Sequence, residues 1–462
     1  MCRLAQELRL PRPPRLAYGQ RMETKRPIQP HATRVAVSHR FADGMAELVY
    51  DEKRRKTGFA IYRDGVSTLA PKISVTGDVE LFPIAPSNNL IKHRALLLPE
   101  KAEPFGTVEE LAAAIEAYLY RYVDLSADFQ RIAAYYVLLT WVYDAFNELP
   151  YLRLRGDFGS GKTRALTVIG SICFRPFFAS GASTVSPIFH TLDTFQGTLI
   201  LDEADFRFTD EKSELVKIFN NGNVRGFPVL RTAITTKREF DPRAFTVFGP
   251  KVVAMRDAFE DQALESRFLT EEMGQRSLRR DIPINLPEEQ KEEALRLRNK
   301  LLTYRFETHR RAQIRAELVD RALSPRLNQI LVPLLSIIDD TALQADIRAA
   351  VKRHEEALYS ERATTLEAAV LEALLTSFGD DPGASVRVGN LASGIIRKHG
   401  NDFSRPITNR LIGEVLRRRL RLVTVKSHGV YVVPVAEHPK VQQLAKRFGL
   451  DEGRADATVD QN

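Results

Sequence analysis

The chain has 462 residues, 44% of them hydrophobic and 27% charged, which excludes a collagen-like or wholly disordered protein and favours a globular one with several domains. The formal net charge is +8, but residues 1–40 contain nine Lys or Arg and two Glu and therefore hold +7 of it. The rest of the chain is close to neutral, so its net charge is weak evidence for nucleic-acid binding.

Residues 1–40 are rich in Pro and Arg, and we expect a disordered basic tail. Three interpretations of these residues stay open: a solvated leader or over-long start, an arm that contacts phosphates, and a transit peptide. The longest apolar stretch, 132–142, is too short to cross a bilayer, which takes about 20 residues, so we expect a buried helix and no membrane partner. Two cysteines, Cys2 and Cys173, exclude a disulfide framework and favour a reducing cytoplasm, with Cys173 in the core.

The next segments differ in their periodicity. Residues 41–100 alternate in short runs around a polar turn, which predicts a small β-rich module. Residues 101–149 form a helical segment that Thr107 and Glu110 open with capping-box spacing. Residues 150–285 alternate short apolar strands with helices, which is typical of an α/β domain with a parallel sheet.

The C-terminal part is predicted to be mostly helical. Residues 286–361 have the periodicity of a helical lid packed on the core. Residues 362–436 show helix, short strand, two helices and a hairpin, the order of a winged helix-turn-helix. Residues 437–462 are expected to be a tail.

A phosphate-binding loop follows the first core strand. The sequence Gly-Asp-Phe-Gly-Ser-Gly-Lys-Thr at 156–163 fits G-x-x-x-x-G-K-[ST] in full, between a strand and a helix. Lys162 would neutralise the β- and γ-phosphates of ATP, and Thr163 would bind Mg²⁺. The residues expected to contact the nucleotide are Gly156, Asp157, Phe158, Gly159, Ser160, Gly161, Lys162, Thr163 and Arg164.

A second apolar strand, 198–201, ends in the acidic pair Asp202 and Glu203. Asp202 would hold Mg²⁺, and Glu203 would orient or deprotonate the attacking water. Because the loop and the acidic strand end occur in the right order on the right elements, the sequence predicts an ATPase.

A third strand, 250–255, is followed by Arg256 and then by Arg267. We expect Arg267 to act as a finger on a neighbouring subunit's nucleotide. A surface ion pair with Glu265 or Glu271 is the alternative. Met255 stands where a polar sensor is usual, so the sensor residue stays open.

A hairpin precedes this third strand and carries basic residues. Arg225, Arg231, Lys237 and Arg238 are predicted to contact DNA phosphates from a pore. Solvated turn charges are the alternative.

From these residues the chain resembles the superfamily-three-helicase-like P-loop ATPases of phages, plasmids and integrated mobile elements, which are of the AAA+ type. The resemblance covers roughly residues 150–275, and the segment Asn221-Gly222-x-x-Arg225-Gly226 discriminates it best. It implies an oligomeric ring, commonly a hexamer, that hydrolyses ATP to move along DNA. A primase domain precedes the motor in many members, but the N-terminal segment here is too short to predict one. The other segments that carry the resemblance are Gly156–Thr163, Leu199–Asp205, Gly249-Pro-Lys and Leu264-x-x-Arg267.

The third helix and the wing of the winged helix offer further DNA contacts. Arg410, Arg417 and Lys426 are the residues expected to make them. Winged helices also bind proteins, so that alternative stays open. No histidine has metal-ligand spacing, and no structural metal is predicted.

Taken together, the sequence predicts a Mg²⁺- and ATP-dependent DNA translocase or helicase that serves the replication of a mobile element. A nucleotide-switched regulatory or assembly ATPase without unwinding activity is the main alternative. A small-molecule kinase is a further one, which a finger acting between subunits would argue against.

Overall fold

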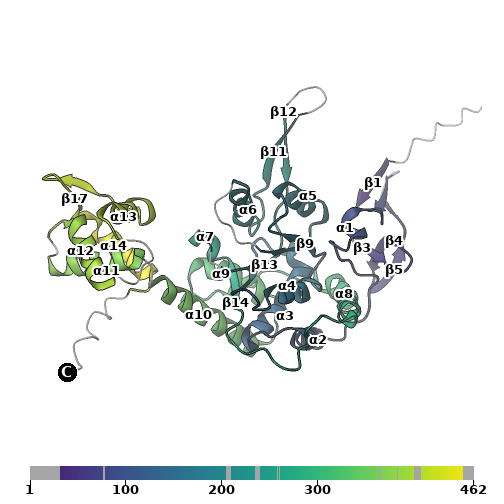
Figure 1. Ribbon diagram of the computed structural model, residues 1–462. Coiled ribbons are helices and arrows are strands. Elements are labelled where there is room, and N and C mark those ends of the chain that lie inside the picture. Colours follow the sequence, from purple (N-terminus) through teal and green to yellow (C-terminus); the bar gives the residue numbers. More distant parts are fainter. Residues whose placement is uncertain are drawn as a thin grey trace, which may run out of the picture.

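The computed structural model describes residues 32–75, 79–203, 210–234, 240–256, 259, 261–363, 366–381, 383–399 and 407–450. Figure 1 shows a central α/β body with a β-rich module on one side and a helical domain on the other. The long helix α10 (Thr341–Ala363) runs from the body towards the helical domain.

The β-rich module consists of two small sheets. The first is antiparallel in the order β2-β3-β4-β5, and the second has the order β1-β7-β6, with β1 parallel to β7. The strands are β1 (Ala32–Ala36), β2 (Ser38–Arg40), β3 (Gly44–Asp51), β4 (Lys56–Arg63), β5 (Val66–Ala70), β6 (Ile73–Val75) and β7 (Val79–Pro83). A short helix, α1 (Asn89–Lys92), follows them.

The expectation of a disordered tail through residue 40 was wrong for residues 32–40. They form β1 and β2, because β1 pairs with a strand more than forty residues later and Arg40 forms an ion pair with Asp144 at 2.6 Å. Such distant partners leave no local pattern in the sequence. Residues 1–31 lie outside the described residues.

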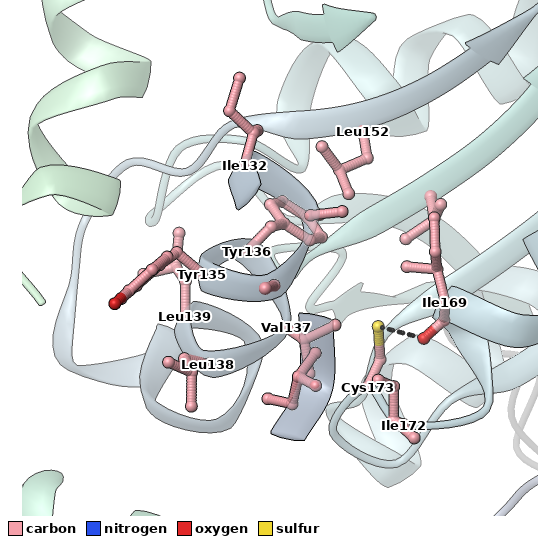
Figure 2. Packing of buried hydrophobic residues seen from close by; sticks show 14 of the residues in the cluster. Ile132, Tyr135, Tyr136, Val137, Leu138, Leu139, Leu152, Ile169, Ile172 and Cys173 are labelled. Carbon is pink, nitrogen blue, oxygen red and sulfur yellow. Dashed lines mark hydrogen bonds between the residues drawn. The ribbon is translucent and has the colours of Figure 1, made fainter. Parts of the chain in front are cut away.

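Two helices lead into the core. The capping box of Thr107 and Glu110 is present at the start of α2 (Val108–Tyr122), and Ser126 caps α3 (Ala127–Val142). Figure 2 shows how α3 packs against Leu152 and Ile169, with Cys173 buried beside them. Burial raises the pKa of the Cys173 thiol, which suits a core position. A 3₁₀ turn, η1 (Tyr143–Ala145), ends the segment.

The core is a parallel five-stranded sheet in the order β14-β8-β13-β10-β9, as the α/β prediction expected. Its strands are β8 (Tyr151–Arg155), β9 (Phe177–Ser180), β10 (Leu199–Asp202), β13 (Lys251–Met255) and β14 (Phe268–Glu272). The helices between them are α4 (Lys162–Gly170), α5 (Val185–Phe195), α6 (Asp210–Asn221) and α7 (Gln262–Glu265). Between α6 and β13 the chain forms the antiparallel hairpin β11 (Val229–Ile234) and β12 (Phe240–Phe245), which projects from the body in Figure 1.

The helices after the sheet are α8 (Glu288–Thr308), the 3₁₀ turn η2 (Ala316–Leu318) and α9 (Pro325–Leu335), followed by α10. Both α8 and α9 pack on α3. The buried face of α9 includes Leu327, Ile330, Leu331 and Leu334, as its periodicity predicts. This layer covers the side of the sheet on which α3 lies.

The last domain has its own core. Its elements are α11 (Leu366–Asp380), β15 (Val386–Arg387), α12 (Val388–His399), α13 (Asn409–Glu414), the π-helical turn η3 (Val415–Arg419), β16 (Val425–Ser427), β17 (Val430–Val433), the 3₁₀ turn η4 (Val435–Glu437) and α14 (His438–Arg447). The expected tail at 437–462 was wrong for 438–450, because α14 packs on α11 and buries Val441 and Phe448. Residues 451–462 lie outside the described residues.

Candidate functional site

The loop between β8 and α4 has the shape that phosphate binding requires. Gly159 and Gly161 adopt φ of 73° and 87°, the left-handed region that glycine enters without a Cβ clash. A Cβ on Gly156 would lie 2.6 Å from the carbonyl oxygen of Met273, so only glycine fits there. The loop therefore wraps tightly ahead of α4, and N–H groups of such a loop can face a phosphate at the helix N-terminus.

Lys162 begins α4 and lies at the mouth of this loop. Its ammonium donates to the carbonyl oxygens of Gly156 at 2.5 Å and Asp157 at 2.6 Å. Thr163 follows it in the first helical turn and is exposed. Both side chains are thus within reach of phosphate oxygens and of a cation beside them.

The acidic pair lies at the carboxyl end of β10, next to the loop. Glu203 has φ of 54°, which is unusual for a residue with a side chain, and its N–H donates to Asp202 Oδ1 at 2.9 Å. Gly181 packs against it so closely that a Cβ there would lie 2.5 Å from the Glu203 carbonyl oxygen. Because Gly181 has no side chain, it leaves room for the strained backbone of Glu203, a residue that lines the cavity described next.

One cavity of about 300 Å³ brings the loop and the acidic pair together. Phe158, Gly159, Ser160, Gly161, Lys162, Thr163, Arg164, Asp202, Glu203, Ala254, Met255 and Arg256 line it. Of the expected nucleotide contacts, Gly156 and Asp157 are absent from this lining, and Asp157 lines the neighbouring cavity instead.

The donor set in this cavity fits Mg²⁺. The Thr163 hydroxyl and the Asp202 carboxylate are hard oxygen donors, and Mg²⁺ usually takes one or two such protein ligands beside phosphate and water. Within the described ranges, no cluster of three or more His, Cys, Asp or Glu could hold a metal by itself.

A second cavity of about 560 Å³ adjoins the first, and six of its fourteen lining residues have apolar side chains. Three of them are strongly exposed: Phe158 at 78%, Leu278 at 64% and Ile284 at 87%. Arg164 donates to the carbonyl oxygens of Pro283 and Ile284, and the guanidinium of Arg256 lies 3.4 Å from the centre of the Phe158 ring. Exposed apolar side chains beside the phosphate loop suit a nucleobase. Sequence reasoning missed this cavity, because residues 278–284 carry no motif.

Comparison with known proteins gives little beyond this geometry. No protein-family model matches the chain, and no curated protein does. The solved structures that it resembles include the C-terminal region of NrS-1, at 12% identity with a TM-score of 0.34 over 84% of this chain and 96% of that one. They also include the active helicase Cch of SCCmec type IV, at 12% identity and a TM-score of 0.36 over 90% and 80% of the two chains. A third is the JCV helicase, at 16% identity and a TM-score of 0.25 over 44% and 58%. Likenesses at scores this low carry no weight for the function of the chain.

Arg267, the expected finger, is engaged in contacts within its own chain. It is 7% exposed, and its guanidinium donates to Asn223 Oδ1 at 2.9 Å, to Asn220 Oδ1 at 2.6 Å and to the carbonyl oxygen of Ala263 at 2.6 Å. All three acceptors belong to the same chain. The alternative ion pair is absent too, because Glu265 pairs with Arg153 and Glu271 with Arg276.

The hairpin residues expected to contact DNA have different surroundings. Arg225 donates to the carbonyl oxygens of Asp144 at 2.8 Å and Phe146 at 3.1 Å, so it anchors the base of the hairpin. Arg231 makes two hydrogen bonds to Glu214 at 3.1 and 3.0 Å. Lys237 and Arg238 lie outside the described residues.

Lys251 is a buried residue below this hairpin. Its ammonium donates to the carbonyl oxygens of Gly249 at 2.9 Å, Val247 at 3.0 Å and Gly222 at 3.3 Å, and burial lowers its pKa to about 7. A Cβ on Gly222 would lie 2.4 Å from this Nζ atom. The segments Asn221-Gly222 and Gly249-Pro-Lys251 therefore pack against each other through the Lys251 ammonium.

In the C-terminal domain, Arg410 is exposed on α13. Arg417 donates to the Thr424 hydroxyl at 3.3 Å and lies 5.7 Å from the centre of the Tyr431 ring. Lys426 is the cross-strand partner of Tyr431, so Lys426 and Tyr431 share one face of the β16–β17 hairpin. Of the three residues expected to contact DNA, Arg417 and Lys426 therefore lie close to the Tyr431 side chain.

Proposed function

We propose that this chain is a Mg²⁺-dependent ATPase that couples hydrolysis to movement along DNA, as a translocase or helicase. The observation that carries the proposal is the single cavity that Lys162, Asp202 and Glu203 line together. Nucleotide hydrolysis requires this combination, because the phosphates, the cation and the attacking water have to be held at one point.

The residues divide the chemistry among them. The loop N–H groups and Lys162 neutralise the phosphate oxygens, and Thr163 and Asp202 hold Mg²⁺. When bound, the cation stabilises negative charge on the β- and γ-phosphates. Glu203 accepts a proton from the water whose oxygen attacks the γ-phosphorus, while the bond to ADP breaks. The exposed apolar walls at Phe158, Leu278 and Ile284 receive the adenine.

The coupling to DNA rests on two basic elements outside the ATPase centre, the β11–β12 hairpin and the winged helix. The family resemblance of residues 150–275 supports a ring, commonly a hexamer, that acts on a mobile element's DNA. The low cysteine count favours the cytoplasm as its location. No described helix is long and apolar enough to span a membrane.

The decisive measurement is the steady-state ATPase rate with and without single-stranded DNA, for wild type, Lys162→Ala and Glu203→Gln. We expect DNA to stimulate the wild-type rate and both variants to lose at least about 10²-fold, because each removes a group that acts in the transition state. Lys291→Ala is the matched control, since Lys291 is exposed at the start of α8 and its salt bridge is with the exposed Glu288. A wild-type rate that DNA leaves unchanged would contradict the motor.

One observation favours the second candidate, a nucleotide-switched regulatory or assembly ATPase. The guanidinium of Arg267 makes its hydrogen bonds within its own chain, which favours an ATPase that does not use Arg267 as a finger between subunits. In that case hydrolysis would proceed without DNA stimulation, and the same measurement separates the two.

A further inference from the structure

A cationic and aromatic patch lies at the base of the β11–β12 hairpin, outside the ATPase cavity. Arg231 on β11 and Arg243 on β12 are direct cross-strand partners, so their side chains leave the hairpin on the same face. A cavity of about 360 Å³ lies here, and Phe189, His190 and Phe245 line it together with these arginines.

The aromatic rings hold the patch in place. The guanidinium of Arg231 lies 5.1 Å from the centre of the Phe189 ring, and that of Arg243 lies 4.8 Å from the centre of the Phe245 ring. His190 stacks on Phe189 at 4.8 Å and meets Phe245 edge-on at 4.5 Å. Phe189 and Phe245 are buried, whereas His190 is exposed. One face of the His190 imidazole is therefore stacked on the buried Phe189 ring.

The charges in the patch are not balanced. Glu214 takes two hydrogen bonds from Arg231. Arg243 is exposed, and no acidic side chain of the described residues forms a salt bridge with it. Glu214 also lines the cavity and already balances Arg231, so Arg243 is the cation of the pair that is left to take a phosphate.

We propose that this patch binds single-stranded nucleic acid, with one phosphate on Arg243 and one unpaired base stacked on His190. Single strands fit better than duplex DNA, because a base in a duplex is already stacked and paired and cannot cover an imidazole face. The patch deepens the proposed function, on which it rests, by adding a contact on α5 and at the foot of the hairpin.

The test is the affinity for a fluorescent oligothymidine, measured by anisotropy from 50 to 300 mM salt with a non-hydrolysable ATP analogue. His190→Ala should weaken binding about tenfold, since stacking on one aromatic side chain is worth about that much. His190→Phe keeps an aromatic face and should retain most of the affinity. Arg243→Gln should weaken binding and lower the salt slope by about 0.7, the value for one phosphate contact on a single strand.

Two exposed positions far from the hairpin in sequence serve as controls. His93→Ala and Arg296→Gln remove the same residue types and should bind the oligonucleotide as wild type does. Thermal melting of each variant shows that it is folded.

The outcomes separate this inference from the proposed function. Tight wild-type binding that His190→Ala and Arg243→Gln leave unchanged would overturn the patch but not the motor. Equal losses in His190→Ala and His190→Phe would overturn the stacking role. If the wild type binds no single-stranded DNA at all, both the patch and the DNA motor are contradicted. The ATPase site is tested separately, by the loss of ATPase activity in Lys162→Ala.

Discussion

At the scale of single residues, the catalytic geometry depends on a backbone conformation that Glu203 adopts at some cost. A left-handed φ in a non-glycine residue costs on the order of 1 kcal/mol and persists only where the surroundings impose it. Gly181, at the end of the neighbouring strand, leaves the space in which the Glu203 carbonyl lies. We infer that Gly181 positions Glu203 without touching the nucleotide.

Gly181→Ala tests this inference. A methyl group would push the Glu203 backbone away, and small misplacements of reacting groups can cost about 10²-fold, so we expect kcat to fall about tenfold to 10²-fold with little change in KM. Adding Gly181→Ala to Glu203→Gln should lower kcat no further. Gly379→Ala is the control, because a Cβ at Gly379 meets nothing within 4 Å. An additive loss in the double variant would mean that Gly181 acts elsewhere.

The sequence predicted the loop and the acidic pair but not Gly181. The motif residues are recognisable because phosphate and Mg²⁺ chemistry fixes their types and spacing. Gly181 lies outside any motif and meets Glu203 only because β9 and β10 are neighbours in the sheet. The apolar cavity walls at Leu278 and Ile284 were missed for the same reason, since only the folded chain brings them to the loop.

At the scale of elements, Arg267 connects α7 to the end of α6. Its donors engage Asn220 and Asn223, which lie on either side of Gly222. Gly222 in turn packs on the Lys251 ammonium at the foot of the hairpin. The spacing of Arg267 behind its strand suggested a finger, but spacing does not reveal which way a side chain turns.

Arg267→Ala is expected to destabilise the fold. Removing a buried guanidinium leaves two amide oxygens without their donor, so the free energy of unfolding should drop by about 2 to 4 kcal/mol, as measured by urea denaturation. Activity should fall with it, and mixing the variant with Lys162→Ala subunits should not restore it. A finger between subunits predicts the reverse: unchanged stability and recovered activity in mixed oligomers.

At the scale of the whole molecule, one buried network joins three parts of the chain. Arg305 of α8 donates to Glu47 of β3 at 2.7 Å and to both carboxylate oxygens of Asp144 at 2.8 and 2.9 Å. Arg175 donates to Glu47 as well. The β-rich module, the helices after the sheet and the α/β core are therefore one unit, although the sequence suggested a module separate from the core. A pattern of alternating residues shows that strands exist but not what they pack against.

Asp144→Asn tests how much this network contributes. Burial disfavours the Asp144 carboxylate, but Arg305 and His309 outweigh that and hold its pKa well below the usual range. A depressed folded-state pKa stabilises the fold fully above the unfolded value of about 3.9, and this contribution is lost as the pH falls through the folded value. The variant leaves Arg305 with one carboxylate, so its free energy of unfolding at pH 7 should be about 3 kcal/mol lower than that of the wild type.

The difference between the two proteins should shrink below about pH 4, because Asp144 then binds a proton in the unfolded state, and it should vanish as the pH falls through the folded pKa. Urea denaturation at a series of pH values measures it. Asp346→Asn is the control, since Asp346 pairs with Arg131 at 66% side-chain exposure and exposed pairs contribute at most about 1 kcal/mol. If Asp144→Asn changed the free energy of unfolding no more than Asp346→Asn at pH 7, the network would not be what holds the module to the core. Apolar packing, such as the stacking of Tyr62 on Phe306, would then hold it. In that case Ala substitutions at these two rings would lower the free energy of unfolding more than Asp144→Asn does.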